Sequence, residues 1–215
     1  MPARSRTQVI RGADNARSGA DAAAAVFAAT RLSHVAYVRN GFPCVWPTLH
    51  GLVDGQLILH GSSAGSFAKA VRSGAELCVC ATALDGLVLA RSQFEHSVHY
   101  RSAIVFGRAQ EITGTEAKRE AGKALTDALI AGRAAEARPG SDQELKATML
   151  ATLSLEECSV KVGEGPPEDE ADDVALPVWA GVVPIREVFG DPVPAPDLRA
   201  GIPLAPSVEA LLGRR

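Results

Sequence analysis

The sequence lacks the features that would place the chain in a membrane, in a secretory route or on nucleic acid. No apolar run in its 215 residues reaches the ~18 residues that a membrane-spanning helix needs. The basic N-terminal stretch, residues 1–20, has no apolar core and is not expected to act as a secretory signal. The formal net charge of -3 argues against a general nucleic-acid surface, which needs a concentrated basic face. We therefore expect a cytoplasmic protein that binds neither membranes nor nucleic acid.

Metal-binding patterns are also missing. The four cysteines include no Cys-x-x-Cys pair, and two of them alternate within one expected strand, so reduced buried thiols are favoured over a metal site. His96 and His99 have the spacing of one helix face, and His50 and His60 would complete a set, but no ordered Cys/His spacing supports zinc. A Gly-x-Gly-x-x-Gly dinucleotide fingerprint is absent as well. We expect no metal site. The cysteines are Cys44, Cys78, Cys80 and Cys158.

The sequence does contain enough apolar material for one folded domain. Hydrophobic residues make up 47% of the chain, which excludes disorder. A chain of this length buries roughly 70% of the surface that it exposes when unfolded. We expect one domain over residues 1–215, with a helical N-terminal lead-in, a core over about 33–190 and a proline-rich C-terminal tail.

Tight turns predict a mostly antiparallel sheet. Asn40-Gly41, Asp54-Gly55 and Asp85-Gly86 each lie between apolar runs, and both residues of each pair accept positive φ, so each predicts a two-residue hairpin. Strands joined in this way form a meander, and a meander that continues around becomes a barrel. We expect six or so antiparallel strands with flanking helices. The expected strands cover residues 33–40, 42–50, 56–60, 77–84, 87–90, 103–112, 157–162 and 178–185.

Capping patterns predict the helices. Three Ser/Thr residues stand three positions before an acidic residue, the arrangement that begins a helix. These pairs predict helices over 18–32, 113–132 and 141–149, and a further short helix is expected over 67–72. The acidic stretch 163–177 should be a solvated loop, and the proline-dense tail over 191–206 should lie extended. The capping pairs are Ser18 with Asp21, Thr113 with Glu116, and Ser141 with Glu144.

The densest group of functional side chains lies in residues 84–107. Arginines, histidines, a glutamate, a tyrosine and a serine fall within twelve residues between two apolar strands, which is costly unless they meet water or a ligand. Arg101 and Ser102, at the start of an expected strand, suit an anion, because an arginine fork gives a phosphate two charge-assisted hydrogen bonds. A surface arginine on an edge strand is the alternative. His96 and Tyr100 are the candidate catalytic proton donors.

The loop at residues 61–65 has two functional interpretations. It matches Gly-x-Ser-x-Gly, the nucleophile elbow of serine hydrolases, with Asp85 and His96 following Ser63 in the order such enzymes use. That elbow belongs to parallel sheets, whereas the turns here predict antiparallel neighbours. The favoured interpretation is an anion cradle, in which backbone amides and the start of the next helix approach a phosphate. Lys69 and Arg72 follow within two turns, and a plain strand-to-helix turn is the third possibility.

The run LVLARSQFEHSVHYRSAIVFG resembles the flavin-binding split-barrel family related to pyridoxamine 5'-phosphate oxidase. It carries His-Ser-x-x-Tyr-Arg-Ser at residues 96–102, before a Val/Ile-rich strand that ends in Phe-Gly. The likeness extends from about residue 35 to about residue 184. It implies a split β-barrel and a homodimer that holds FMN at the subunit interface.

The resemblance also implies a set of flavin contacts. Residues 46–49 would line the flavin ring, the loop that begins at His60 would meet the phosphate, and Trp179 would lie on a late strand that reaches the partner's site. Phe67 or Ala68 stands where many relatives have a phosphate-binding Lys or Arg, so whether Ser66, Phe67 or Lys69 meets the phosphate stays open. Packing alone would also explain the two tryptophans. The implied cofactor contacts are Trp46, Pro47, Thr48, Leu49, His60, Gly61, Ser62, Ser66, Tyr100, Arg101, Ser102 and Trp179.

The function implied by the resemblance is that of an FMN-dependent oxidoreductase acting on a small molecule. Pyridoxamine phosphate oxidases carry an arginine and a histidine near the C-terminus, but residues 176–188 contain Arg186 and no histidine, so that substrate is not expected. His99 departs from the asparagine that is usual at its position. A non-catalytic flavin-binding or storage protein, and a split barrel that uses haem or a deazaflavin, are the alternatives.

Overall fold

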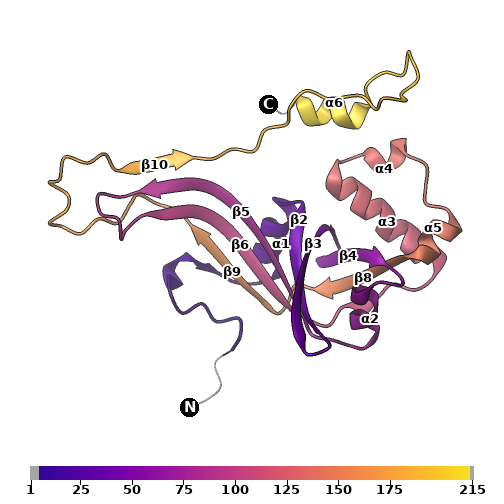
Figure 1. Ribbon diagram of the computed structural model, residues 1–215, viewed down its shortest axis with the longest axis horizontal. Helices are drawn as coiled ribbons and strands as arrows, with labels where there is room; N and C mark the ends of the chain where they lie inside the picture. The colour runs from indigo at the N-terminus through magenta and orange to yellow at the C-terminus, as the bar shows by residue number, and fades with distance from the viewer. Residues whose placement is uncertain (1–4, 214–215) are drawn as a thin grey trace.

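A computed structural model of the chain describes residues 5–213 and shows one sheet of ten strands (Figure 1). The strand order is β1-β9-β6-β5-β2-β3-β4-β8-β7, with β10 added to β5. All pairings among the described strands are antiparallel, as predicted. The strands are β1 (Ala16–Arg17), β2 (Leu32–Arg39), β3 (Phe42–Val53), β4 (Gln56–Ser62), β5 (Leu77–Leu89), β6 (Ser97–Gly107), β7 (Gln110–Glu111), β8 (Thr148–Ser154), β9 (Cys158–Gly163) and β10 (Gly181–Pro184).

Two of the three predicted hairpin turns are confirmed. Asn40 and Gly41 have φ of 51° and 81°, and Asp54 and Gly55 have φ of 49° and 71°, the positive values that such turns require. The prediction at Asp85-Gly86 is wrong, because β5 continues through this dipeptide with a bulge between Leu84 and Gly86. A β-carbon on Gly86 would lie 3.2 Å from the Val183 carbonyl oxygen of β10. The glycine therefore admits a neighbouring strand rather than a turn.

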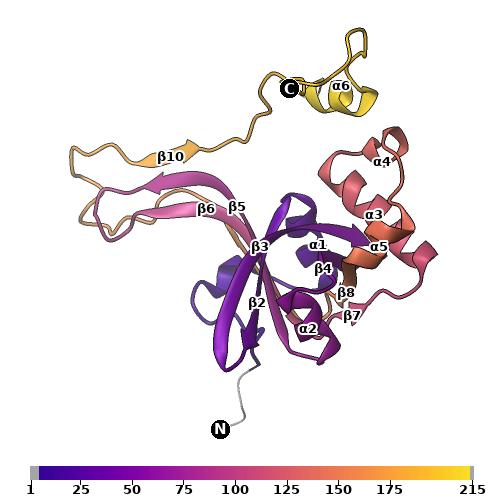
Figure 2. The same cartoon turned by 45° about the vertical axis from the view of Figure 1, so that its right-hand side comes forward.

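The continuous β5 pairs with β6 along a ribbon that projects from the barrel (Figures 1 and 2). We call this ribbon, with β10 along its β5 edge, the arm. The predicted strands over 77–84 and 87–90 are thus one strand, and the strand predicted from 103 begins at Ser97. His99 therefore lies within β6, and His96 directly precedes it. The prediction that their spacing marks one face of a helix is wrong.

Six α-helices and one short 3-10 helix flank the described sheet. Only the capping box at Ser141 and Glu144 is confirmed. The caps predicted at Ser18 and Thr113 are wrong: the N-cap positions are Gly19 and Gly114, whose extended, positive-φ backbones begin each helix later and leave no side-chain cap. No helix within 5–213 has the length and apolar character needed to span a membrane. The helices are η1 (Ala13–Asn15), α1 (Ala20–Ala28), α2 (Ser66–Arg72), α3 (Thr115–Leu129), α4 (Arg133–Glu136), α5 (Asp142–Ala147) and α6 (Pro206–Leu212).

Two segments of the C-terminal half differ in how well they match the sequence prediction. The helix predicted through Met149 ends at Ala147, and the apolar run that follows is β8, which pairs with β4. The periodicity of a short apolar run does not distinguish a helix from a strand. Here the run forms a strand because it pairs with the edge of β4. The tail over 186–205 is largely exposed and lacks regular structure, as expected, before α6 docks on α4. Glu136 accepts hydrogen bonds from the Ser207 amide (2.8 Å) and hydroxyl (2.6 Å).

The sheet has a buried inner face and an open outer face. Helix α1 packs into the barrel, where Phe27, Val35 and Val79 belong to the core. Alternate residues of the same strands point outward, because side chains alternate across a strand. Val38 and Val45 on this side are 65% and 63% exposed. We call this surface the outer face; it comprises Leu32, His34 and Val38 of β2, Pro43, Val45 and Pro47 of β3, Cys78, Cys80, Thr82 and Leu84 of β5, and Ser102 and Ile104 of β6.

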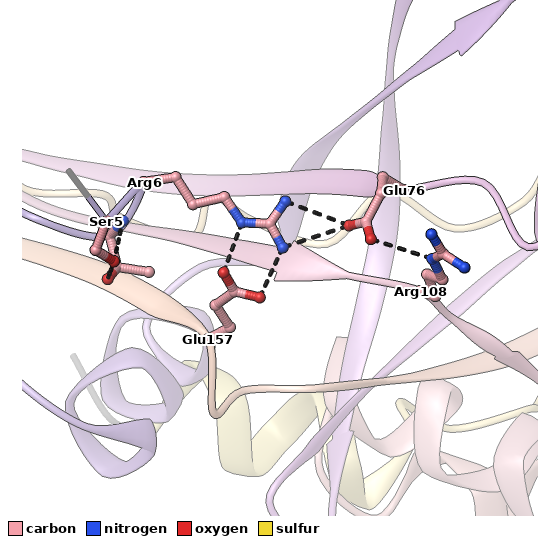
Figure 3. A network of polar contacts seen from close by, with 6 residues as sticks. Ser5, Arg6, Glu76, Arg108 and Glu157 are labelled. Atoms are coloured by element: carbon pink, nitrogen blue, oxygen red, sulfur yellow. Dashed lines mark hydrogen bonds and ion pairs between the residues drawn. The ribbon is translucent and has the colours of Figure 1, made fainter. Parts of the chain in front are cut away.

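The N-terminal segment is anchored beside the barrel by Arg6 (Figure 3). Its guanidinium donates two hydrogen bonds of 2.6 Å to Glu157 and two of 3.3 and 3.4 Å to Glu76, which also accepts from Arg108 at 3.1 Å. Arg6 also lies over the Phe106 ring, 4.9 Å from its centroid. The network joins residues that precede β5 and β9, and because it is exposed its contribution to stability is modest.

Candidate functional site

The end of the β2–β3 hairpin, the end of β4 and α2 line an open cavity of about 520 Å³. Its aromatic wall is ordered by packing: the Trp46 and Phe67 ring centroids are 4.7 Å apart, and Tyr37 meets Trp46 edge-on at 5.8 Å. The Tyr37 hydroxyl donates a 2.7 Å hydrogen bond to Ser66 Oγ. Four residues predicted to contact the cofactor are brought together here, namely Trp46, Gly61, Ser62 and Ser66.

The glycines of the 61–65 loop are required by close packing. A β-carbon on Gly61 would lie 3.1 Å from the Phe67 ring, and one on Gly65 would lie 3.0 Å from the Ser62 carbonyl oxygen. Several loop amides already have acceptors: Ser63 donates to the Ala147 carbonyl at 2.8 Å, and Gly65 donates to the Ser62 carbonyl at 2.9 Å. The loop thus offers an anion fewer free amides than the cradle interpretation requires, and α2 has only seven residues.

Two cationic side chains near the loop could bind an anion in place of its backbone amides. A second cavity of about 670 Å³ shares Tyr37, Arg39 and Ser66 with the first and is also lined by Lys69. The side chains of Arg39 and Lys69 make no hydrogen bond or ion pair with another residue in the described part of the chain, although both residues make backbone hydrogen bonds. The Arg72 guanidinium, by contrast, is paired with Glu111, to which Nε and Nη2 each donate a 2.9 Å hydrogen bond. The sequence reasoning considered Lys69 but missed Arg39, although its position just before the Asn40-Gly41 turn was a usable signal.

The predicted phosphate ligand Arg101 lies elsewhere, in the middle of β6 on the arm. Its Nε and Nη2 atoms each donate a 2.8 Å hydrogen bond to Asp85, the residue at the β5 bulge. The bonds from Arg101 lower the pKa of the Asp85 carboxyl, so the pair is fully ionised at neutral pH. Arg101 and Ser102 line neither of the two cavities above, and one chain alone does not bring them to the 61–65 loop.

Tyr100 and the two histidines line a third cavity, of about 420 Å³, on the arm. His96 Nδ1 lies 2.7 Å from the Ser92 carbonyl oxygen, and His99 Nε2 lies 2.7 Å from the Gly165 carbonyl oxygen. The ammonium of Lys161 is 5.9 Å from the centre of the Tyr100 ring. The candidate proton donors are therefore separate from the cavity that contains Trp46.

The remaining predicted contacts are dispersed. Thr48 is buried on the inner face, and its hydroxyl lies 3.4 Å from His60 Nδ1. Pro47 and Leu49 alternate with it and so point to the opposite side of β3. Trp179 precedes β10 and is 66% exposed, with its ring against Gly181.

The geometry excludes the hydrolase interpretation of Ser63. Strand β4 pairs antiparallel with both β3 and β8, so the loop is not the elbow of a parallel sheet. Asp85 is held by Arg101 rather than by a histidine. His96 bonds to a backbone carbonyl of its own loop, so the three residues form no triad. Within residues 5–213, no three His, Cys, Asp or Glu side chains are grouped to hold a metal ion.

Comparisons with known proteins agree with this architecture. Residues 19–162 match the family model of pyridoxamine 5'-phosphate oxidase. The chain is similar to the FAD and heme binding protein from Mycobacterium smegmatis, with 41% identity over 92% of this chain and 97% of that chain and a TM-score of 0.87. It is also similar to the flavocytochrome Anf3 from Azotobacter vinelandii, with 37% identity over 96% of each chain and a TM-score of 0.90.

A third structure shares the fold only. It is a putative 5-nitroimidazole antibiotic resistance protein from Bacteroides thetaiotaomicron, 18% identical over 68% of this chain and 86% of that chain, with a TM-score of 0.58. No curated protein matches the chain significantly.

Proposed function

Because this chain belongs to the pyridoxamine 5'-phosphate oxidase family and has its split-barrel fold, we propose that it is a flavin- and haem-binding oxidoreductase acting on a small molecule. Two similar structures support this proposal by their names, one an FAD and heme binding protein and the other a flavocytochrome. The observation in this chain that carries it is the pair of adjoining cavities, which places an aromatic wall next to two cations whose side chains have no partner within residues 5–213.

Each cavity lies within the range of about 300–1,000 Å³ that is typical of cofactor sites, and together they combine aromatic surface with positive charge. Trp46 and Phe67 offer apolar surface for a ring, and Arg39 and Lys69 offer charge for phosphate. Sequence reasoning favoured FMN. We propose FAD instead, because a second cavity with two cations suits a cofactor that has two phosphates and an adenosine.

The chain's own residues would then divide the work. A bound flavin supplies hydride or electron transfer, which no side chain here provides. Arg39 and Lys69 neutralise the phosphates, Trp46 orients the ring and excludes water from one side, and Tyr37 holds Ser66 in place through its hydrogen bond. His96 and Tyr100 stay candidates for proton transfer. Within one chain they lie away from the flavin cavity, so those acting on this ring would come from a second chain.

The proposed assembly is a homodimer formed through the outer face. This face is broad and apolar, it is uncovered in a single chain, and it borders the first cavity through Pro43 and Val45. Patches of this kind on soluble proteins mark interaction sites. We infer that the second copy contributes its arm, with Arg101 and Tyr100, to the flavin cavity of the first, because these residues line neither flavin cavity within one chain.

The test starts from the absorption spectrum of the purified protein, in which flavin, deazaflavin and haem are distinguishable. Titration of the apoprotein, followed by flavin fluorescence, should show FAD binding at least about tenfold more tightly than FMN. Arg39→Ala and Lys69→Ala should each weaken FAD by about tenfold or more, since each removes a charge-assisted bond. Lys123→Ala, an exposed cation on α3, is the matched control. Tighter binding of FMN would contradict the choice of FAD.

Turnover is tested separately. The bound flavin should be reduced by NADH or NADPH and reoxidised by a small acceptor at a steady rate. A flavin that binds tightly but stays inert to both nicotinamides and to a panel of acceptors, nitro compounds included, would favour a binding or storage protein over an enzyme.

A further inference from the structure

Residues 186–204, which connect β10 to α6, are not packed against the rest of the chain. Every residue of this segment is exposed. Figures 1 and 2 both show it crossing from the arm to α6 clear of the barrel. Connections in folded proteins run over the surface of their own domain, which covers one side of them. We call this segment the strap.

The strap exposes apolar side chains. Val188 is 82% and Val193 is 91% exposed, more than Val38 and Val45 of the outer face. Segments that stay solvated have few such residues and more charge. A continuous apolar surface, unlike a single apolar side chain, marks an interaction site. The apolar side chains of the strap are Val188, Phe189, Val193, Leu198, Ile202 and Leu204, with Pro192, Pro194, Pro196 and Pro203 among them.

Both ends of the strap are fixed to this chain. Before its start, β10 pairs with β5, and the Ile185 amide donates a 2.9 Å hydrogen bond to the Asp85 carbonyl oxygen. After its end, Ser207 is buried and donates its two hydrogen bonds to Glu136 of α4. Because the ends are held, the course of the strap is set and its apolar side chains are already presented to a partner.

The strap is continuous with the outer face. Ile185, at its start, is bonded to the residue that follows Leu84 of that face. The Arg31 guanidinium lies over the Phe189 ring of the strap, 4.9 Å from its centroid, and Arg31 directly precedes Leu32 of the same face. A molecule that covered the outer face would therefore meet the strap at the border of that face.

The outer face alone is small for a stable dimer. It comprises about a dozen side chains, whereas a standard interface takes roughly 20–30 residues from each partner. The apolar and proline side chains of the strap bring the total into that range. Since a two-fold dimer uses the same surface on both copies, each copy would contribute both parts.

The prolines suit the strap to burial in an interface. A buried backbone N–H without a partner is costly, and proline has none. Proline also fixes φ, so a segment rich in it loses less conformational entropy when a partner covers it. Val193 stands between Pro192 and Pro194, and the second proline keeps the backbone of Val193 extended.

We propose that the strap packs against a second copy of this chain that lies on the outer face. By two-fold symmetry the strap of the second copy packs against the first. The inference rests on the homodimer of the proposed function and extends it. The interface then has two parts, the outer face of the sheet and a strap that reaches around the partner.

The experiment measures the dimer Kd of the full-length protein by light scattering across a concentration series. Val188→Asp and Val193→Asp should each raise the Kd by at least about tenfold, because each places an unpaired charge in the interface. Ile10→Asp is the matched control. Ile10 is also β-branched and is 60% exposed, but it lies before the edge strand β1, outside both the strap and the outer face. Its substitution should leave the Kd within about threefold of wild type.

Trypsin provides a second measurement. Arg186 and Arg199 are exposed cleavage sites in the strap. Protein diluted below its Kd should be cut at both sites, because exposed segments without regular structure are preferred by proteases. The dimer should be cut there at least about tenfold more slowly. At a concentration where wild type is dimeric and Val193→Asp is monomeric, only the variant should be cut rapidly.

The outcomes separate the strap from the homodimer. A dimer that both strap variants leave unchanged, but that Leu84→Glu on the outer face dissociates, would overturn the strap and leave the homodimer of the proposed function intact. A wild-type protein that stays monomeric at every concentration would overturn both. Slow cleavage at every concentration, with lower melting temperatures for the strap variants, would show that the strap packs on its own chain and would overturn the inference.

Discussion

For Arg101, the sequence predicted an anionic partner but did not identify which one. An arginine next to Tyr100 and Ser102 led us to expect that Arg101 binds an anion. The partner was not readable, because Asp85 lies 16 residues away and faces Arg101 only through the bulge in β5. Because Asp85-Gly86 was predicted to be a turn, Asp85 was not considered as the partner of Arg101. Two of the three guanidinium nitrogens bond to Asp85, which leaves Nη1 for a ligand.

This geometry sets the size of the effect expected for Arg101→Ala. With one nitrogen free, the variant loses one charge-assisted bond of about 1.5–3 kcal/mol, so flavin affinity should fall roughly 10- to 150-fold. Ser63→Ala is the control at the other predicted anion position, and it should change affinity by less than about threefold, because the Ser63 hydroxyl has no partner within residues 5–213 and the hydrolase geometry is absent. Fluorescence quenching measures both.

Asp85→Ala separates binding from structure. If Arg101 serves only its ion pair, Arg101→Ala and Asp85→Ala will lower the melting temperature alike and leave flavin affinity unchanged. That pattern would show that Arg101 is not a phosphate ligand.

At the scale of elements, the helix starts show why local patterns succeed or fail. Ser18, Thr113 and Ser141 all match the capping pattern, but only Ser141 accepts from the backbone, with Glu144 N–H at 3.3 Å. In the other two cases a glycine stands one residue later and takes an extended conformation with positive φ, which moves the helix away from the capping side chain. The pattern was right about where helices lie and wrong about how two of them begin.

Ser141→Ala and Thr113→Ala test this difference directly. Loss of the Ser141 cap should destabilise the protein by about 1 kcal/mol. Thr113→Ala should cost less than about 0.5 kcal/mol, since its hydroxyl caps nothing. Urea unfolding at neutral pH measures both variants. Equal losses would mean that the Thr113 hydroxyl caps α3 in solution.

The Ser141 effect should also persist in mild acid. Arg138, followed by the Ser141 amide and hydroxyl, lowers the pKa of Glu144 to about 2. A carboxyl whose folded pKa lies below its unfolded value stabilises the protein above the unfolded pKa, and this contribution is lost as the pH falls through the folded one. The capping box should therefore remain intact at pH 4.

At the scale of the molecule, tight turns, the His-Ser-x-x-Tyr-Arg-Ser run and the family resemblance were sufficient to predict an antiparallel split barrel. They did not predict the arm, the outer face or the adjoining cavities. Each of these depends on strands far apart in sequence, such as β10 on β5 or β2 on β5. Local signals report which residues form a strand, and only long-range pairing decides which side of it stays open.

The outer face yields the prediction that concerns the whole molecule. Leu84 lies on this face of β5 and is 47% exposed in a single chain, whereas Leu129 on α3 is 41% exposed and lies outside the face. Leu84→Glu should leave each chain folded but place an unpaired charge inside a dimer, which costs several kcal/mol and should raise the dimer Kd by more than about 100-fold. Leu129→Glu should stay dimeric. Light scattering across a concentration series distinguishes the two, with circular dichroism confirming the fold. A Leu84→Glu protein as dimeric as wild type would place the second copy elsewhere, and the flavin cavity would then have to function without the partner's arm.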